Sequence, residues 1–92
     1  MNKKEIIQQV SSKTSINQKY TIKIIDATIK AIIEATASGE TVQLAGFGTF
    51  EAHVRKERTG KNLLTGEDIK IAASTVPIFR AAKDFKQMVN KL

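Results

Sequence analysis

The sequence predicts a small α+β domain, with helices at both ends of the chain and strands between them. Isoleucines recur at helical spacing within the first forty residues. From about residue 41 to residue 80, apolar and polar residues alternate between glycine-containing turns, as in half-buried strands. The length of 92 residues, with 41% hydrophobic and 26% charged residues, is typical of one soluble domain.

Two helices are expected before the strands. The first begins after Asn2, which has Glu5 three residues later in the spacing of a capping box, and it ends near Lys13. Asn17 is a favourable N-cap for a second helix, which runs to the residue before Gly39. These 40 residues are predicted to form a helical dimerisation part.

The second helix is predicted to carry apolar side chains on two faces. The wider face holds Ile22, Ile25, Ile29, Ile32, Ile33 and Thr36. A smaller stripe on another side holds Tyr20, Ile24, Ala27, Ala31 and Ala35, and the charged residues occupy the remaining arc. A helix with two apolar faces needs two surfaces to pack against, and a chain of this size supplies barely one. A homodimer with interlocked helices is therefore expected.

The strands are predicted to form a sheet and a long hairpin arm. A first strand at 41–45 leads through a tight turn at 46–48 into a second strand. The arm covers about 54–75 with its tip near Leu63, and it is expected to be mobile until something binds it. Residues 76–79 return to the body, where Pro77 suits an edge strand or the start of a strand. A helix spans 82–92, with Ala82, Phe85, Val89 and Leu92 on one side.

Charge narrows the range of functions. Fifteen Lys and Arg against nine Asp and Glu give a formal charge of +6, which favours a polyanionic partner such as DNA, RNA or an anionic membrane. No apolar run approaches the roughly 20 residues that span a bilayer, and the first ten residues lack the apolar core of a signal peptide. The absence of cysteine excludes disulfides, thiolate nucleophiles and Cys-ligated zinc. A cytoplasmic protein is predicted.

No enzymatic site is predicted. The carboxylates are scattered singly or beside lysines, with no cluster suited to two-metal chemistry and no clear Ser/His/Asp arrangement. His53 is the only histidine, so a metal site there would depend on carboxylates alone. The expectation is a protein without catalytic residues, metal, cofactor, small-molecule substrate or membrane partner.

Four segments together resemble the bacterial HU/IHF histone-like proteins, and the resemblance covers essentially the whole chain. The segments are Gly46 to Glu51, the arm tip with Asn62 and Thr65-Gly66-Glu67, Ile69-Lys70-Ile71, and Val76 to Ala81 followed by Lys83. The resemblance implies an intertwined homodimer with two N-terminal helices, a three-stranded antiparallel sheet, a long β-hairpin arm and a C-terminal helix. It also implies that the two arms embrace the minor groove of double-stranded DNA.

The chain departs from the family pattern at four positions. The tip reads Lys61-Asn62-Leu63 where the family usually has Arg-Asn-Pro, whose proline wedges between base pairs. Ala72 replaces a common proline, and His53 stands where an arginine is common. The wedge in this protein would therefore be leucine, and minor-groove binders also use leucine to unstack a base step.

The resemblance assigns DNA-binding roles to side chains on the arm and the body. Arg55, Arg58 and Lys61 are expected to contact phosphates or the minor groove, and Leu63 is expected to insert between bases, with Leu64 in a supporting part. The phenylalanines Phe47, Phe50, Phe79 and Phe85 are interpreted as core and not as platforms for base stacking. The full predicted DNA-binding set is Lys3, His53, Arg55, Arg58, Lys61, Asn62, Leu63, Lys70, Ser74, Arg80, Lys83 and Lys86.

The resulting hypothesis is a nucleoid-associated architectural protein that bends and compacts duplex DNA with little sequence preference. A sequence-preferring relative of the IHF kind is the main alternative. A helix-turn-helix regulator is less favoured, because the second helix has few Asn, Gln or Arg side chains to read base edges. RNA binding stays open.

Overall fold

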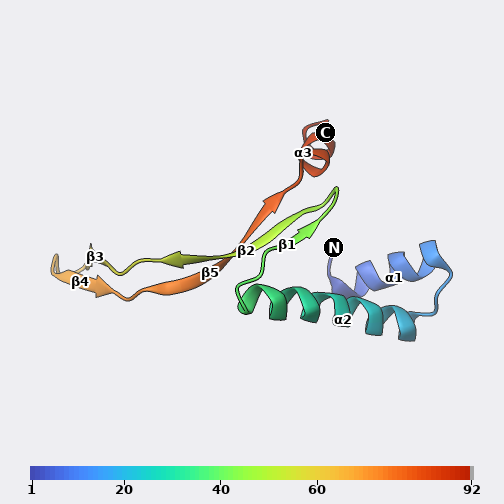
Figure 1. Ribbon diagram of the computed structural model, residues 1–92, viewed down its shortest axis with the longest axis horizontal. Coiled ribbons are helices and arrows are strands. Elements are labelled where there is room, and N and C mark those ends of the chain that lie inside the picture. The colour runs from blue at the N-terminus through green and yellow to red at the C-terminus, as the bar shows by residue number, and fades with distance from the viewer. Residues whose placement is uncertain (92) are drawn as a thin grey trace. The chain divides into compact units, whose positions relative to one another are not determined.

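A computed structural model describes residues 1–91 and places helices at both ends of the chain, with antiparallel strands between them (Figure 1). This confirms the predicted α+β class; Leu92, assigned to the last helix, lies outside the described residues. The contacts divide the chain into two compact units, Met1–Glu34 and the part from Ala35 onward. The elements are α1 (Lys3–Thr14), α2 (Gln18–Ala37), β1 (Val42–Leu44), β2 (Gly48–Arg55), β3 (Arg58–Lys61), β4 (Asp68–Ile71), β5 (Ser74–Ala81) and α3 (Lys83–Asn90).

The predicted N-caps of the first two helices are confirmed. The Glu5 N–H donates to Asn2 Oδ1 at 2.9 Å, and the Tyr20 N–H donates to Asn17 Oδ1 at the same distance. Each bond satisfies a backbone N–H that has no partner inside its helix. The turn between the helices includes Ser15, which has a left-handed backbone with φ of 58°.

The C-terminus of α2 is closed as Gly39 predicts. Gly39 has φ of 93°, a conformation that glycine adopts without a steric penalty. Its N–H donates to the Thr36 carbonyl at 3.1 Å, and the Glu40 N–H donates to the Ala35 carbonyl at 3.0 Å. These two bonds form a Schellman motif, which stops the helix and satisfies two of its last carbonyl groups.

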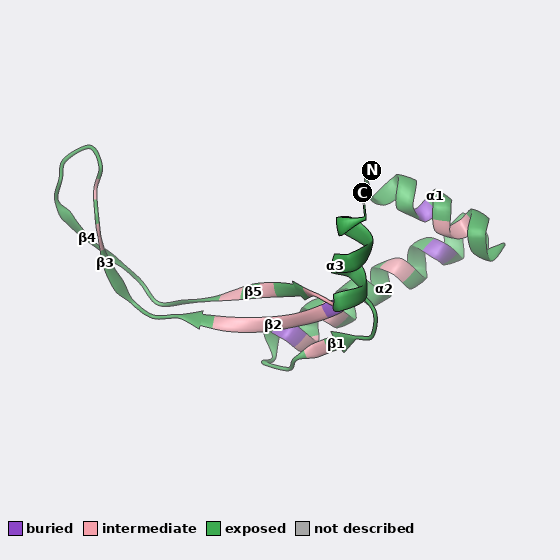
Figure 2. Cartoon of the chain, turned by 90° about the horizontal axis from the view of Figure 1, so that it is seen from above, coloured by how far each residue is buried: buried purple, intermediate pink, exposed green. Residues whose placement is uncertain are grey.

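Little apolar surface is buried within one chain. Ile7, at 7% exposure, is the one buried apolar side chain among residues 1–91. Most of the cartoon in Figure 2 has the colour of exposed residues. Both predicted apolar faces of α2 keep large side chains in solvent, namely Tyr20, Ile22, Ile24, Ile29 and Ile33. No helix in the described part of the chain is both long and apolar enough to cross a bilayer.

The strands form the predicted three-stranded antiparallel sheet, in the order β1-β2-β5, with β2 in the centre. Pro77 lies within β5, which is an edge strand, one of the two placements expected for this proline. The turn between β1 and β2 is closed by the Phe47 N–H, which donates to the Leu44 carbonyl at 3.0 Å. Gly46 supplies the positive φ of 78° that this turn requires.

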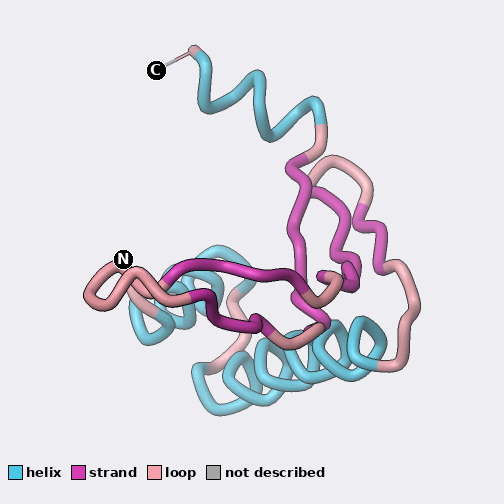
Figure 3. The backbone as a smooth tube through the Cα atoms, turned by 90° about the vertical axis from the view of Figure 1, so that its left-hand side faces the viewer, coloured by secondary structure: helices cyan, strands magenta, loops and turns pink. Residues whose placement is uncertain are grey.

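The arm is a hairpin whose ladder of paired strands is interrupted once. Strands β3 and β4 pair separately from the main sheet, and backbone without strand pairing separates them from β2 and β5 (Figure 3). The register runs from Arg55 opposite Ser74 to Arg58 opposite Ile71, so two residues on each limb lie in the interruption. Because the interruption contains two residues on each limb, the register is unchanged across it and the side chains alternate along the whole arm.

The four phenylalanines form a cluster in the second unit, as predicted. Their ring centroids lie between 4.8 Å (Phe50 to Phe79) and 6.2 Å (Phe79 to Phe85) apart in the contacting pairs. The cluster is not a closed core, because Phe47, Phe79 and Phe85 are still 43%, 40% and 37% exposed within one chain. Aromatic rings that pack on each other on one side only need a further cover to complete their burial.

We expect Gly48→Ala to destabilise the fold strongly. A methyl group at Gly48 would lie 2.5 Å from the Arg80 carbonyl oxygen and 2.5 Å from Phe79 Cε1, so a paired backbone would have to move. A loss of about 2 to 3 kcal/mol in the free energy of unfolding is expected. Gly60→Ala is the control, because its methyl group would meet the flexible Ile71 Cδ1 at 3.1 Å. Urea unfolding of both variants measures the difference, and equal losses would contradict it.

Candidate nucleic-acid interface

The arm, residues 54–75, presents cations that have no acidic partner. Arg55, Lys56, Arg58 and Lys61 are exposed and form no ion pair within residues 1–91. Lys70 is the exception, because its Nζ lies 2.9 Å from Glu57 Oε1. Lys56 was not among the predicted contacts, although its place between two arginines in the same polar run was a signal for it.

Strand alternation distributes these cations over both faces of the arm. Arg58 lies directly opposite Ile71, so it shares a face with Ile69 and Ile71, which are 44% and 37% exposed. Lys61 and Lys70 lie on the other face. The arm therefore offers an arginine beside apolar surface on one side and lysines on the other.

The tip is a compact loop built around Asn62. The Asn62 N–H donates to the Glu67 carbonyl at 2.8 Å, and the Gly66 N–H donates to the Asn62 carbonyl at 2.7 Å. The Asn62 side chain accepts from the Leu64 N–H at 2.9 Å, so this amide oxygen is already used in the turn. The loop leaves the side chains of Leu63 and Leu64 98% and 96% exposed. Two adjacent leucines are thus held out in water at the tip.

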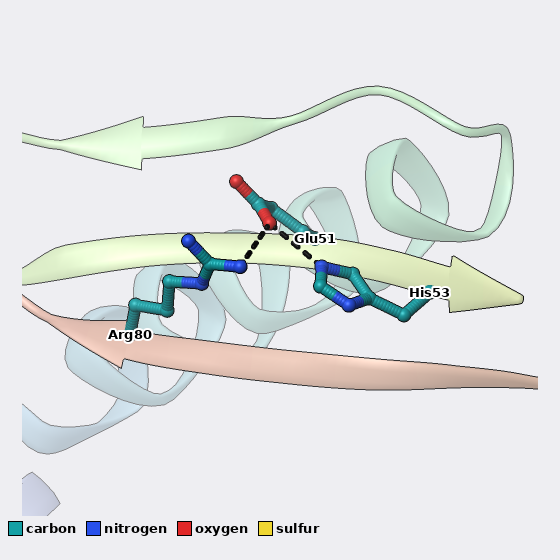
Figure 4. Close-up of polar contacts among 3 residues, drawn as sticks. All are labelled: Glu51, His53 and Arg80. Carbon is teal, nitrogen blue, oxygen red and sulfur yellow. Dashed lines mark hydrogen bonds and ion pairs between the residues drawn. The ribbon is translucent and has the colours of Figure 1, made fainter. Parts of the chain in front are cut away.

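On the sheet next to the arm, one carboxylate contacts two residues that are predicted to bind DNA (Figure 4). Glu51 Oε2 lies 2.8 Å from His53 Nε2 and 3.7 Å from a guanidinium nitrogen of Arg80. The hydrogen bond from His53, helped by the positive charge of Arg80, holds the pKa of Glu51 below its ordinary value. Glu51 was not among the predicted site residues, because its contact with Arg80 depends on the register of β2 against β5.

The other predicted contacts lie on three elements. Lys3 is in the first unit, where its Nζ lies 2.5 Å from Asp26 Oδ1. Ser74 begins β5 directly opposite Arg55. Lys83 and Lys86 lie in the first half of α3 and are exposed. The second unit therefore holds eleven of the twelve predicted contacts, and nine of these lie on the sheet or arm: His53, Arg55, Arg58, Lys61, Asn62, Leu63, Lys70, Ser74 and Arg80.

Comparison with known proteins assigns the chain to a family. The family model described as bacterial DNA-binding protein matches residues 1–90. The DNA-binding protein HU of Pasteurella multocida is 47% identical over 89 residues, which cover 97% of this chain and 99% of that protein. The HU protein of Clostridium pasteurianum is 46% identical over 91 residues, which cover 99% of this chain and all of that protein.

A solved structure shows the same architecture. The Anabaena HU–DNA cocrystal structure superposes with a TM-score of 0.90 at 43% sequence identity, covering 97% of both chains. The sequence and the fold therefore lead to one conclusion. This chain belongs to the bacterial DNA-binding protein family that includes the HU proteins.

Proposed function

We propose that this protein is a histone-like architectural protein that binds double-stranded DNA with little sequence preference and bends and compacts it. The observation that carries the proposal is the arm, where four unpaired cations lead to two fully exposed leucines. A basic ribbon in the minor groove neutralises phosphates and releases counterions, and an apolar tip can unstack a base step. This combination favours binding by charge and DNA deformation over the reading of bases.

The proposed DNA contacts are of three kinds. The arm cations contact phosphates and the walls of the minor groove, with Ser74 and Asn62 adding polar contacts. The leucine at position 63 acts as the wedge. Body residues hold the flanking duplex, namely Lys3, His53, Arg80, Lys83 and Lys86, with Lys70 released from Glu57 when DNA approaches.

The working unit is proposed to be an intertwined homodimer. The exposed isoleucines of α2 and the half-exposed phenylalanines leave more apolar surface in water than a stable small domain tolerates. A second copy covers both surfaces at once and supplies the second arm, so that the duplex is held from two sides. It also doubles the positive charge that faces the DNA.

The chemistry of the arm suits an architectural role and not catalysis. Its side chains bind and position a polyanion, and the family to which the chain belongs is one of DNA-binding proteins. The expected location is the bacterial nucleoid, in the cytoplasm.

A competition experiment tests the proposal. A labelled duplex bound to the protein is challenged with unlabelled duplex DNA, single-stranded DNA and RNA of equal length, at several salt concentrations. Duplex DNA should compete best, and duplexes of unrelated sequence should compete alike. Better competition by RNA would contradict the proposal, and a preference of about ten-thousandfold for one duplex would indicate sequence-specific recognition of the IHF kind.

Leu63→Ala should reduce DNA bending while retaining most of the binding. The alanine keeps the loop backbone and every cation but removes the side chain proposed to fill the unstacked step. Leu63→Pro should preserve bending or increase it, because proline loses no rotamer freedom on insertion. Ring closure or end-to-end energy transfer measures the bend. Equal bending by Leu63→Ala and the parent protein would show that the arms clasp the groove without a wedge at this position.

A further inference from the structure

We infer that the Glu51 carboxylate occupies a phosphate-binding subsite formed by His53 and Arg80, and that a DNA phosphate displaces it when the duplex binds. The inference rests on the proposed DNA-binding function. It adds to that function a residue that competes with DNA, because Glu51 lowers the affinity of the site that it fills.

The geometry of the three side chains carries the inference (Figure 4). One carboxylate oxygen, Glu51 Oε2, receives both the Nε2 of His53 and the guanidinium of Arg80, from neighbouring strands. Two nitrogen donors that converge on one anionic oxygen also suit a non-bridging phosphate oxygen. The carboxylate therefore stands where a phosphodiester would be held.

The subsite is accessible from solvent. The side chains of Glu51, His53 and Arg80 are 27%, 35% and 64% exposed. The 3.7 Å contact between Glu51 and Arg80 is too long for a hydrogen bond, and exposed ion pairs of this kind contribute little free energy. An incoming phosphate thus has only a weak contact to displace at Arg80.

The surroundings favour an anion that comes from outside the protein. Glu51 is the only acidic residue on β2 and β5. Strand alternation places Arg55 on the same face of β2, with Ser74 directly opposite it, next to the arm. A duplex that follows the unpaired cations of the arm onto the sheet therefore meets this subsite next.

The first test compares Glu51→Gln with Glu40→Gln. Glu40 follows α2, is exposed and forms no ion pair within residues 1–91, so its variant makes the same change in net charge without touching the subsite. At equal salt and neutral pH, Glu51→Gln should bind a non-specific duplex about three- to tenfold more tightly than Glu40→Gln. Equal or weaker binding by Glu51→Gln would overturn the inference, since Glu51 would then not compete with DNA.

The second test repeats the comparison in an Arg80→Ala background, which removes one of the two donors of the subsite. If Glu51 competes with a phosphate for Arg80, the gain in duplex affinity from Glu51→Gln should be smaller in this background than in the parent protein. An equal gain in both backgrounds would overturn the assignment of the phosphate to this subsite. A parent protein that binds no duplex would instead reject the proposed function itself, so the two failures are distinguishable. Circular dichroism confirms that each variant is folded.

Discussion

Ile33→Asp should abolish the folded protein instead of yielding a folded monomer. In one chain Ile33 is 61% exposed, so a charge there would cost little if the monomer were the working unit. In the proposed homodimer, α2 packs its apolar faces against a second copy, and the introduced carboxylate becomes an unpaired charge in that interface. The cost is several kcal/mol, which is comparable with the whole stability of a small domain. Thermal unfolding by circular dichroism measures the loss.

A control on the charged stripe of α2 separates dimerisation from helix propensity. Lys30→Asp changes the charge by more than Ile33→Asp does, but Lys30 is exposed and pairs only weakly with Glu34 at 3.8 Å. This variant should stay folded and dimeric in sedimentation equilibrium. The unfolding temperature of the parent protein should rise with protein concentration, as it does for an obligate dimer. A folded monomer of the parent at micromolar concentration would contradict the proposed dimer.

Features set by local chemistry were predictable from the sequence. Asn2, Asn17 and Gly39 act on backbone groups within five residues, so their roles as helix caps follow from residue type and spacing alone. The tight turn at Gly46 and the edge position of Pro77 are local in the same sense, because each depends on the backbone of that residue.

Features that depend on register were not predictable. The sequence places the arm at about 54–75 with its tip near Leu63, and the hydrogen bonds close the loop between Asn62 and Glu67, in agreement with those bounds. The sequence does not give the register of β2 against β5, and a shift of one residue there would change every cross-strand partner. The contact of Glu51 with Arg80 was missed for this reason, although both residues and their strands were recognised.

The interruption of the arm had no sequence signal. Lys56 and Glu57 face Ala72 and Ala73 across the break, and none of these residues is a glycine or a proline that would mark a turn or a bulge. The alternation of side chains continues through the interruption, so the sequence pattern is the same as that of one continuous strand. The separation of β3 and β4 from the main sheet therefore depends on how the two limbs pair, and the sequence of either limb alone does not indicate it.

Replacing Arg55, Arg58 and Lys61 together by alanine should remove most of the affinity for DNA. A dimer in which these residues and their neighbours neutralise about eight phosphates should show a slope near −7 for the logarithm of the binding constant against the logarithm of salt concentration. The triple variant removes six cations from the dimer, so the slope should decrease in magnitude to about −2. The affinity for duplexes of every sequence should decrease alike. The control is a triple alanine variant of Lys19, Lys23 and Lys30, which lowers the net charge equally but leaves the arm intact. If the magnitude of the slope decreases equally in both triple variants, net charge alone attracts the duplex. A loss confined to the arm variant would show that the unpaired cations of the arm contact the phosphates, because only contacting groups release condensed counterions.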